Sequence, residues 1–320
     1  MRGDLEPSCN MRTSLPMKKL IQKAEILLEA LPYIKSFYNK TIVIKYGGSA
    51  MVSDDLKENF ALDIVMMKYI GINPVVVHGG GPQIDKTLKA LGIQSRFIEG
   101  QRVTNKETID VVEMVLGGKV NKEIVSLINH QGGSAVGITG KDGDMIFAKR
   151  YKKVNHSPEM DRPEIIDLGL VGEITKVNPR ILETLDRNEF IPVIAPIAKG
   201  EKGETLNINA DFVAEKIASA LKAEKLILMT DTEGVKNKAG KLQSSLTRKQ
   251  ASDLIRSKVI RDGMLPKVNC CLDALKSGVH KTHIIDGRVR HALLLEIFTE
   301  EGIGTQIVEK TKDLINNLSG

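Results

Sequence analysis

Cysteine is scarce in this sequence, and the few cysteines present are poorly spaced for metal chemistry. The 320 residues include three of them, Cys9, Cys270 and Cys271. An odd, sparse set without metal-ligand spacing indicates a reducing compartment and no zinc site. Cys270 and Cys271 lie in a helical pattern, where we expect them to pack in the core rather than to react.

Long apolar runs are also missing. No stretch has the length needed to span a bilayer, and the N-terminus lacks the apolar region of a signal peptide. Low-complexity segments and internal repeats are absent as well. We therefore expect a cytoplasmic protein with no membrane partner.

Aromatic residues make up 4% of the chain, tryptophan is absent, and the net charge of +6 is modest for this length. The sequence has no RNP-like aromatic motif and no dense tract of arginine and lysine, which nucleic-acid-binding proteins commonly carry. We interpret the charge as a solvated surface that serves an anionic small molecule, and we expect no nucleic-acid partner.

The standard nucleotide-binding signatures are incomplete. The segment Ala135-Val-Gly-Ile-Thr-Gly140-Lys141-Asp142 approaches a Walker A loop but lacks its leading glycine and its final Ser or Thr. The segment Gly79-Gly-Gly81-Pro-Gln-Ile84 lacks the third glycine of a dinucleotide fingerprint. Both observations disfavour a P-loop NTPase and a Rossmann dehydrogenase.

Two glycine-rich turns are the strongest positive feature, because each directly follows an apolar run. Residues 41–45 lead into Tyr46-Gly47-Gly48-Ser49, and residues 74–78 lead into Gly79-Gly80-Gly81-Pro82. A short β-branched run that ends in glycines before a helical pattern indicates a strand, a tight turn and a helix N-terminus. Glycine allows close approach of the backbone, and amides at a helix start attract anions. The pair predicts a phosphate-binding site.

The remaining pattern alternates strands with helices, which predicts an α/β fold with a mainly parallel sheet covered on both faces. Ser53 is expected to begin a helix that stops at Gly71, and Pro82 one that stops at Gly92. We expect hairpins over 140–177, with Gly143, Gly169 and Gly172 at the turns. The other expected helices cover 105–130, 178–188, 210–222 and 264–277, and the other strands 135–138, 190–195, 225–229, 282–285 and 305–308.

The N-terminal region allows two interpretations. Residues 1–16 are polar and mixed, and we expect them to be disordered, whereas residues 17–38 have apolar side chains at helical spacing. This amphipathic helix either folds back on its own domain or makes an oligomer contact. The sequence does not decide between them, since both bury one apolar stripe.

Several polar residues are candidates for this site. Each one alone is weak evidence, but together they form one set of charged and amide groups. Lys45 ends a buried strand beside two glycines, Arg102 lies in an expected loop, and Lys267 lies one turn into a helix. Asp211 follows Asn207 and Asn209 at a helix start, where capping is the simplest explanation for one residue alone. His78 is expected to be a structural histidine rather than a base.

This inventory holds two lysines, one aspartate and many amides but no evident general base. A carboxylate acceptor is already ionised at neutral pH and needs no base, whereas a hydroxyl acceptor does. Its difficulty is repulsion by the phosphoryl group, about 4 kcal/mol for two unit charges ~4 Å apart at an effective dielectric of 20. Lysines, magnesium and glycine amides offset such repulsion.

These motifs resemble the amino acid kinase superfamily, and within it the N-acetylglutamate kinase family. The resemblance covers about residues 41–308 and rests on the following segments in this order: Lys45-x-Gly47-Gly48, His78-Gly79-Gly80-Gly81-Pro82, Gly100-x-Arg102-Val-Thr, Asn207-x-Asn209-Ala-Asp211 and Gly263-Met-x-x-Lys267-Val. It implies an αβα sandwich that phosphorylates the γ-carboxylate of N-acetyl-L-glutamate with ATP in arginine biosynthesis. It further implies an oligomerisation helix within 1–40, an amino-acid-substrate lobe with the dimer interface over 41–200, and an ATP lobe over 201–320.

The resemblance also implies roles for individual residues. Lys45 and Lys267 would stabilise the transferring phosphoryl group, and Asp211 would orient both lysines. Gly47, Gly48 and Gly80 would supply amides to the phosphates, while Gly80, Gly81, Arg102 and Asn207 would hold the acceptor. The nucleotide would be held by residues 230–235 and 260–264, including Thr230, Asp231, Gly234, Gly263 and Met264. Mg²⁺ would enter with ATP rather than on protein side chains.

Arginine-inhibited members of this family carry an N-terminal helix, through which they form hexamers, and a C-terminal segment that residues 283–305 resemble. His283, Glu296 and Gly302 are the candidate residues for binding L-arginine, since a glutamate suits a guanidinium group. The resemblance therefore implies feedback inhibition by arginine and a homohexamer. Whether a PII-type signalling protein docks on the chain is left open.

Three alternatives remain at this point. The nearest is a kinase for carrier-bound aminoadipate in lysine biosynthesis, since Arg102 would serve either acceptor. The second is a catalytically inactive arginine sensor or scaffold, which the intact Lys45, Asp211 and Lys267 disfavour. The third is a basic nucleic-acid-binding module, for which binding would depend steeply on salt.

Overall fold

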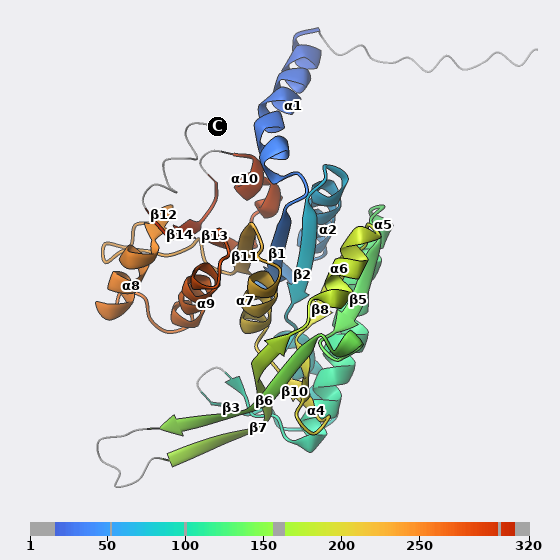
Figure 1. Cartoon of the computed structure of the whole chain (residues 1–320), viewed down its shortest axis with the longest axis vertical. Helices are drawn as coiled ribbons and strands as arrows, with labels where there is room; N and C mark the ends of the chain where they lie inside the picture. The colour runs from blue at the N-terminus through green and yellow to red at the C-terminus, as the bar shows by residue number, and fades with distance from the viewer. Residues whose placement is uncertain (1–16, 52, 99–100, 156–163, 300–301, 311–320) are drawn as a thin grey trace, which may run out of the picture.

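The sheet expected from the alternation is present as eight strands in the order β12-β14-β13-β11-β1-β2-β8-β5 (Figure 1). A computed structural model describes residues 17–51, 53–98, 101–155, 164–299 and 302–310 of the chain. Six neighbouring strands run parallel, and β14 pairs antiparallel with β13. The parallel strands are β1 (Thr41–Tyr46), β2 (Asn73–His78), β5 (Ala135–Thr139), β8 (Ile191–Ala195), β11 (Lys225–Thr230) and β13 (Lys281–Asp286).

The strand order places a topological switch beside β1. The chain builds β2, β5 and β8 on one side of β1 and then returns to place β11, β13 and β14 (Thr305–Val308) on the other. Every residue of β8 and β11 is buried, which explains why these segments read as continuous apolar runs. Ligands of open parallel sheets bind outside the carboxyl ends of the strands at such a switch. Both glycine turns lie at that edge.

Helices cover both faces of the sheet, which confirms the predicted αβα layering (Figure 1). One face carries α2 (Asp54–Tyr69), α5 (Asn121–His130) and α10 (Ala292–Phe298). The other face carries α6 (Arg180–Arg187), α7 (Ala210–Ala220), α8 (Arg248–Arg256) and α9 (Met264–Lys276), with α8 beside β12 (Ser245–Thr247). The short helix α10, the helix α8 and the strand β12 were not expected from the sequence.

The helix expected over 105–130 is continuous but changes its winding. It consists of α4 (Lys106–Glu113), a π-helical segment η2 (Met114–Val120) that contains Gly117 and Gly118, and α5. The helix α3 (Gly81–Ala90) packs against α4 and η2, and it begins directly after the second glycine turn. Ser53 and Pro82 occupy the helix starts that the sequence predicted, although the Ser53 side chain makes no capping hydrogen bond.

A second, four-stranded sheet corrects the prediction for 140–177. One long hairpin, β6 (Ile146–Asn155) and β7 (Glu164–Val177), closes into a ring with β9 (Ile197–Gly200) and β10 (Thr205–Asn207). Gly143 lies in the turn η3 (Asp142–Asp144), as expected. Gly169 and Gly172 do not lie at turns but inside β7: Gly169 sits in an irregularity of the pairing, and Gly172 packs against Leu206 and Ile208. The boundary predicted at residue 200 falls at the last residue of β9, and the division into lobes remains a prediction.

The N-terminal helix α1 (Met17–Phe37) projects from the body of the molecule (Figure 1). None of its residues is buried, and Leu27 and Leu28 are 69% and 66% exposed. Its last turns alone are anchored, where Tyr33 meets Phe298 of α10 edge to face and Phe37 packs against the core. The helix therefore does not fold back on its own domain. Residues 1–16, with Cys9, lie outside the described residues.

None of the helices described is long and apolar enough to cross a membrane.

Candidate active site

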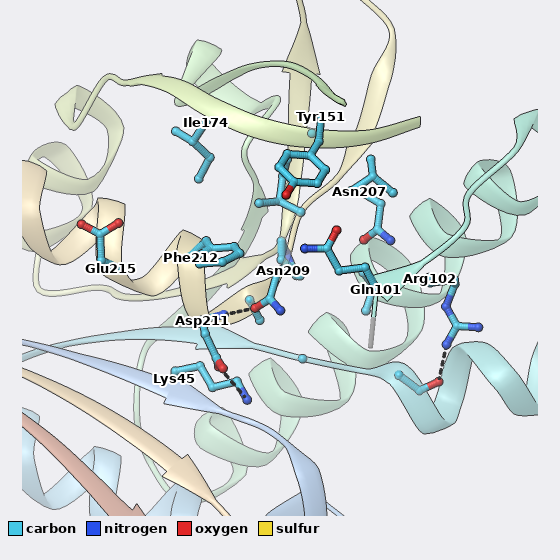
Figure 2. Close-up of a pocket in the computed structure, with 18 of the residues that line it drawn as sticks. Lys45, Gln101, Arg102, Tyr151, Ile174, Asn207, Asn209, Asp211, Phe212 and Glu215 are labelled. Carbon is cyan, nitrogen blue, oxygen red and sulfur yellow. Dashed lines mark hydrogen bonds and ion pairs between the residues drawn. The ribbon is translucent and has the colours of Figure 1, made fainter. Parts of the chain in front are cut away.

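The sequence-predicted lysines and aspartate meet at the carboxyl edge of the sheet. Lys45 comes from β1, Asp211 from the first turn of α7 and Lys267 from the first turn of α9. Lys45 Nζ lies 3.1 Å from Asp211 Oδ1, and Lys267 Nζ donates to Asp211 Oδ2 at 2.8 Å. Asp211 thus bridges the two ammonium groups, and Figure 2 shows its pairing with Lys45 at the base of the cavity.

The carboxylate of Asp211 does not cap α7. Asn209 is the N-cap residue, and its Oδ1 accepts a hydrogen bond from the Asp211 amide at 2.8 Å. The Asp211 carboxylate therefore pairs with the two lysines instead of capping the helix, and the side chain is only 10% exposed. Burial alone would raise the pKa of Asp211, but Lys45 and Lys267 outweigh it and lower the pKa to about 2. The group stays ionised at neutral pH.

A cavity of about 640 Å³ opens above this triad. Gly48, Gly79, Gly80 and Gly81 line it together with Arg102, Asn207 and the triad itself. Gly47 lies just below, where an added Cβ would come within 3.1 Å of Lys45 Nζ. A side chain at position 47 would therefore crowd the lysine, which would have to shift by a few tenths of an ångström. Both glycine turns thus flank one space, as the sequence predicted.

Arg102 is buried in the short strand β4 (Gln101–Arg102), which pairs with β3 (Phe97–Ile98), rather than in the expected loop. Its Nη1 donates to Asp85 Oδ1 at 2.5 Å and also to the Ser95 hydroxyl. The guanidinium lies 4.5 Å from the centre of the Phe97 ring. The Arg102 guanidinium holds the pKa of Asp85 below its usual range. These partners fix the orientation of Arg102 at the cavity wall.

Other residues line the cavity that were not predicted as site residues. Gln101, Tyr151, Asn209 and Phe212 point into the space above Asp211 in Figure 2. Asn209 is a specified residue of a motif quoted for the resemblance, so its place in that motif was a usable signal, whereas Gln101 occupies an unspecified position of its motif. Tyr151 comes from the β6–β7 hairpin, whose place over the cavity depends on tertiary structure alone.

Part of the predicted nucleotide set lines a second cavity of about 410 Å³ near the ends of β11 and β13. Asp231, Gly234 and Met264 line it, and Thr230 and Gly263 precede two of these in the chain. Arg261, from the predicted segment 260–264, also lines it, as does Arg288, which was not predicted. Arg288 is held by Asp286, to which its Nη2 donates at 2.7 Å. The described residues contain no cluster of three or more His, Cys, Asp or Glu side chains that could hold a metal ion.

The three predicted effector residues also lie together, in a cavity of about 900 Å³ at the opposite edge of the sheet. His283 Nδ1 lies 2.5 Å from Glu296 Oε1, and the other Glu296 oxygen accepts from the Ile303 amide at 2.9 Å. Gly302 has a φ of +58°, and an added Cβ would lie 2.9 Å from Glu296 Oε2. Burial would raise the pKa of Glu296, but His283 and Lys225 outweigh it and lower the pKa.

Lys225 also lines this third cavity and was not predicted as a site residue. It is buried at the start of β11, 4.7 Å above the Phe37 ring of α1, and burial lowers its pKa to about 8. A lysine that opens an otherwise apolar strand was a signal that could have identified it.

Comparison with known proteins agrees with this geometry. The model of the amino acid kinase family matches residues 40–286. Acetylglutamate kinase of Syntrophobacter fumaroxidans is 61% identical over 90% of this chain and 97% of that protein. Acetylglutamate kinase of Marinobacter nauticus is 59% identical over 90% of this chain and 99% of that protein.

Two solved structures share the fold. N-acetylglutamate synthase from Neisseria gonorrhoeae, complexed with coenzyme A and N-acetyl-glutamate, has a TM-score of 0.75 at 24% identity. The similarity covers 90% of this chain and 64% of that longer protein. Carbamate kinase from Giardia lamblia bound to AMP-PNP has a TM-score of 0.61 at 14% identity, over 85% of this chain and 99% of that one.

Proposed function

Since the chain belongs to the amino acid kinase family, we propose that it phosphorylates the γ-carboxylate of N-acetyl-L-glutamate with ATP, a step of arginine biosynthesis. The relatives that are about 60% identical over nine tenths of the chain carry this activity in their names. The observation that carries the proposal is the pairing of Lys45 and Lys267 with one buried carboxylate at the floor of a glycine-lined cavity.

The chemistry follows from the charges. An acceptor carboxylate is ionised at neutral pH, so no side chain has to remove a proton. Lys45 and Lys267 neutralise charge on the phosphoryl group as it moves between two anionic oxygens. Asp211 holds the two ammonium groups at a fixed separation, which reduces the reorganisation needed during transfer. Gly47, Gly48 and Gly80 supply backbone N–H groups to the phosphate oxygens.

The acceptor is held at the far side of the same cavity. Arg102 binds its α-carboxylate, because a guanidinium fixed by Asp85 and Phe97 offers donors in a set direction. Asn207, Gly80 and Gly81 complete this part of the site. The nucleotide base occupies the second cavity, with Asp231, Gly234 and Met264 in its wall and Thr230 and Gly263 beside it.

Mg²⁺ enters bound to ATP and supplies charge neutralisation at the β- and γ-phosphates. The reaction takes place in the cytoplasm, an assignment supported by the small, odd number of cysteines in the sequence.

L-Arginine inhibits the enzyme by binding at His283, Glu296 and Gly302. The ionised Glu296 suits a guanidinium, and the surrounding cavity has room for an amino acid. The protein forms dimers through its first half, and α1 joins these dimers into a hexamer. The exposed apolar stripe of α1 supports this assembly, since such a stripe is normally covered in a stable state.

The test is release of ADP from ATP in the presence of Mg²⁺ and N-acetyl-L-glutamate, with and without L-arginine. We expect turnover that requires the acceptor and falls when arginine is added. Turnover that ignores arginine would contradict the regulatory assignment alone. Absence of turnover, with activity on an aminoadipate derivative instead, would contradict the assigned acceptor.

A further inference from the structure

His78 is a buried titratable group beside the active site that the mechanism above does not use. It ends β2 and directly precedes Gly79, Gly80 and Gly81, yet its own exposure is 0%. The three glycines line the 640 Å³ cavity, whereas His78 is buried and is not among the residues that line it. The question is what a fully buried imidazole does there.

The hydrogen bonds of His78 fix its protonation state. Its Nδ1 lies 2.7 Å from the Gly79 carbonyl oxygen, and because that oxygen only accepts, Nδ1 carries the proton. Its Nε2 lies 3.2 Å from Asn121 Nδ2, which only donates, so Nε2 is unprotonated. The imidazole is therefore neutral with its proton on Nδ1.

Asn121 is itself held in one orientation. Its Nδ2 also donates to the Val193 carbonyl at 2.9 Å, and its Oδ1 accepts from Lys122 Nζ at 3.0 Å. Lys122 Nζ donates in addition to the Gly137 carbonyl at 2.9 Å. A reversed amide would place Oδ1 against a carbonyl oxygen and Nδ2 against an ammonium group. This network therefore selects the Nδ1–H tautomer of His78.

The bond to Gly79 has a consequence for the next residue. In a trans peptide group the carbonyl and the following N–H point in opposite directions. His78 draws the Gly79 carbonyl toward the protein interior, so the Gly80 N–H turns toward the cavity. Leu116 and Val120 of η2 pack against Gly80, where an added Cβ would lie 2.6 Å from Leu116 Cδ2.

We infer that His78 is a positioning residue, which uses its Nδ1–H to hold the Gly79–Gly80 peptide so that the Gly80 N–H faces the transferring phosphoryl group. The inference rests on the proposed function, because the group that the Gly80 N–H faces is taken to be the transferring phosphoryl group. His78 does not act as a base, because Nε2 is occupied by Asn121 and the imidazole does not reach the cavity. Burial lowers the pKa of His78 to about 4, in keeping with a permanently neutral donor.

Three substitutions separate positioning from packing. His78→Asn keeps an amide N–H near the place of Nδ1, His78→Gln moves it to the place of Nε2, and His78→Leu removes it. Loss of one donor to a developing oxyanion typically costs about 100-fold in rate. We expect His78→Asn to keep kcat for ADP release within about fivefold, and His78→Gln and His78→Leu to lose about 100-fold.

The KM for ATP is expected to stay within about twofold in all three variants, because one amide contributes mainly when charge develops. Circular dichroism checks that each variant is folded. Equal kcat in the Asn and Gln variants, whether high or low, would overturn the inference, since a packing role does not distinguish the two nitrogen positions.

A second measurement on the wild-type protein needs no variant and no substrate. Long-range ¹H–¹⁵N correlation spectra of ¹⁵N-histidine-labelled protein report which ring nitrogen is protonated. We expect the Nδ1–H tautomer of His78 at pH 7, and an Nε2–H tautomer or an imidazolium would overturn the inference. Inactivity of the wild type with N-acetyl-L-glutamate would instead contradict the proposed function, and the tautomer would still decide the role of His78.

Discussion

At the scale of single residues, the active site depends on charges removed from water. Lys45, Asp211 and Lys267 have side chains that are 12%, 10% and 18% exposed, and each ammonium group pairs with the same carboxylate. Removal of one partner from a buried ion network leaves an uncompensated charge, which costs far more than the pair contributes. The three residues therefore act as a unit.

Replacement of Asp211 by asparagine tests this unit. Asp211→Asn keeps the shape of the side chain but leaves Lys45 and Lys267 to repel each other. We expect kcat to fall by at least about 100-fold at saturating ATP and acceptor, measured by ADP release. Asp54→Asn is the matched control, because Asp54 also lies in the first turn of a helix but is 91% exposed. A kcat for Asp211→Asn within threefold of the control would contradict the assigned role.

The titration of His78 predicts a pH-dependent part of the stability. The pKa is about 4 in the folded state, against 6.5 for an unperturbed imidazole, so between these values the unfolded chain binds the proton and the folded chain does not. This contribution is therefore fully present above pH 6.5 and is lost as the pH falls toward 4. From pH 7 to pH 5 it amounts to about 2 kcal/mol.

Urea unfolding of the wild type and of His78→Gln at pH 7 and pH 5 measures this contribution. We expect the variant to lose about 2 kcal/mol less unfolding free energy than the wild type on acidification. The contribution of Asp63 to the unfolding free energy changes with pH in the opposite direction, because burial raises the pKa of Asp63 to about 6. Asp63 is present in both proteins, so its contribution cancels in the comparison. The same loss in both proteins would show that His78 is not held neutral.

At the scale of elements, a few glycines set how closely one segment approaches another. Gly169 in β7 has a φ of +76°, and an added Cβ would lie 2.3 Å from the Thr104 carbonyl oxygen. The Thr104 amide donates to the Leu168 carbonyl at 2.9 Å, and the Leu170 amide donates to the Thr104 carbonyl at 2.6 Å. This contact fixes the segment that follows Arg102 against the barrel.

Gly169→Ala is therefore expected to affect stability and acceptor binding together. The left-handed backbone and the close carbonyl should cost more than about 2 kcal/mol, and displacement of Arg102 should raise the KM for N-acetyl-L-glutamate severalfold. Gly203→Ala is the matched control, because Gly203 has a φ of +82° with nothing within 4 Å of an added Cβ. It should cost about 1 kcal/mol with no change in KM. Equal effects of the two substitutions, in urea unfolding and in KM, would contradict the prediction.

At the scale of the whole molecule, two features stand out. The two halves of the chain share one sheet, because β1 pairs with β2 on one side and with β11 on the other. The helix α1 stands outside this body with an apolar stripe that includes Leu20, Leu27 and Leu31. The shared sheet joins the two predicted lobes. The apolar stripe of α1 leaves a surface for contact with another subunit.

A charge on the stripe of α1 tests its role in assembly. The double variant Leu27→Lys and Leu31→Lys places two charges in the apolar stripe, and we expect it to be dimeric where the wild type forms the proposed hexamer. Light scattering after size-exclusion chromatography measures the mass. Gln22→Lys on the opposite face of the helix is the control and should leave the mass unchanged. An unaltered mass in the double variant would exclude α1 from the interface.

Much of the sheet could be predicted because each strand is a buried apolar run ended by glycine or a polar turn. Lys45 could be selected from its position at the end of such a run, and Asp211 from its position at a helix start. The contact between them depends on the register of β1 and the packing of α7, which the spacing of residues in the sequence does not reveal. The barrel was missed because Gly169 and Gly172 serve close packing within a strand, whereas glycine pairs of this kind more often mark turns. The sequence did not decide whether α1 packs on its own domain or contacts another subunit, since both arrangements require the same helical spacing of apolar residues.

The strands β11 and β13 each connect two of the cavities described above. β11 begins at Lys225, in the cavity that holds Glu296, and ends at Thr230, next to the cavity that holds Asp231. β13 likewise begins at Lys281 and leads through Asp286 to Arg288. A strand of six residues has a nearly constant length of about 17 Å, because its rise per residue hardly varies. The two strands therefore separate the two cavities by a distance that stretching of the backbone can hardly change.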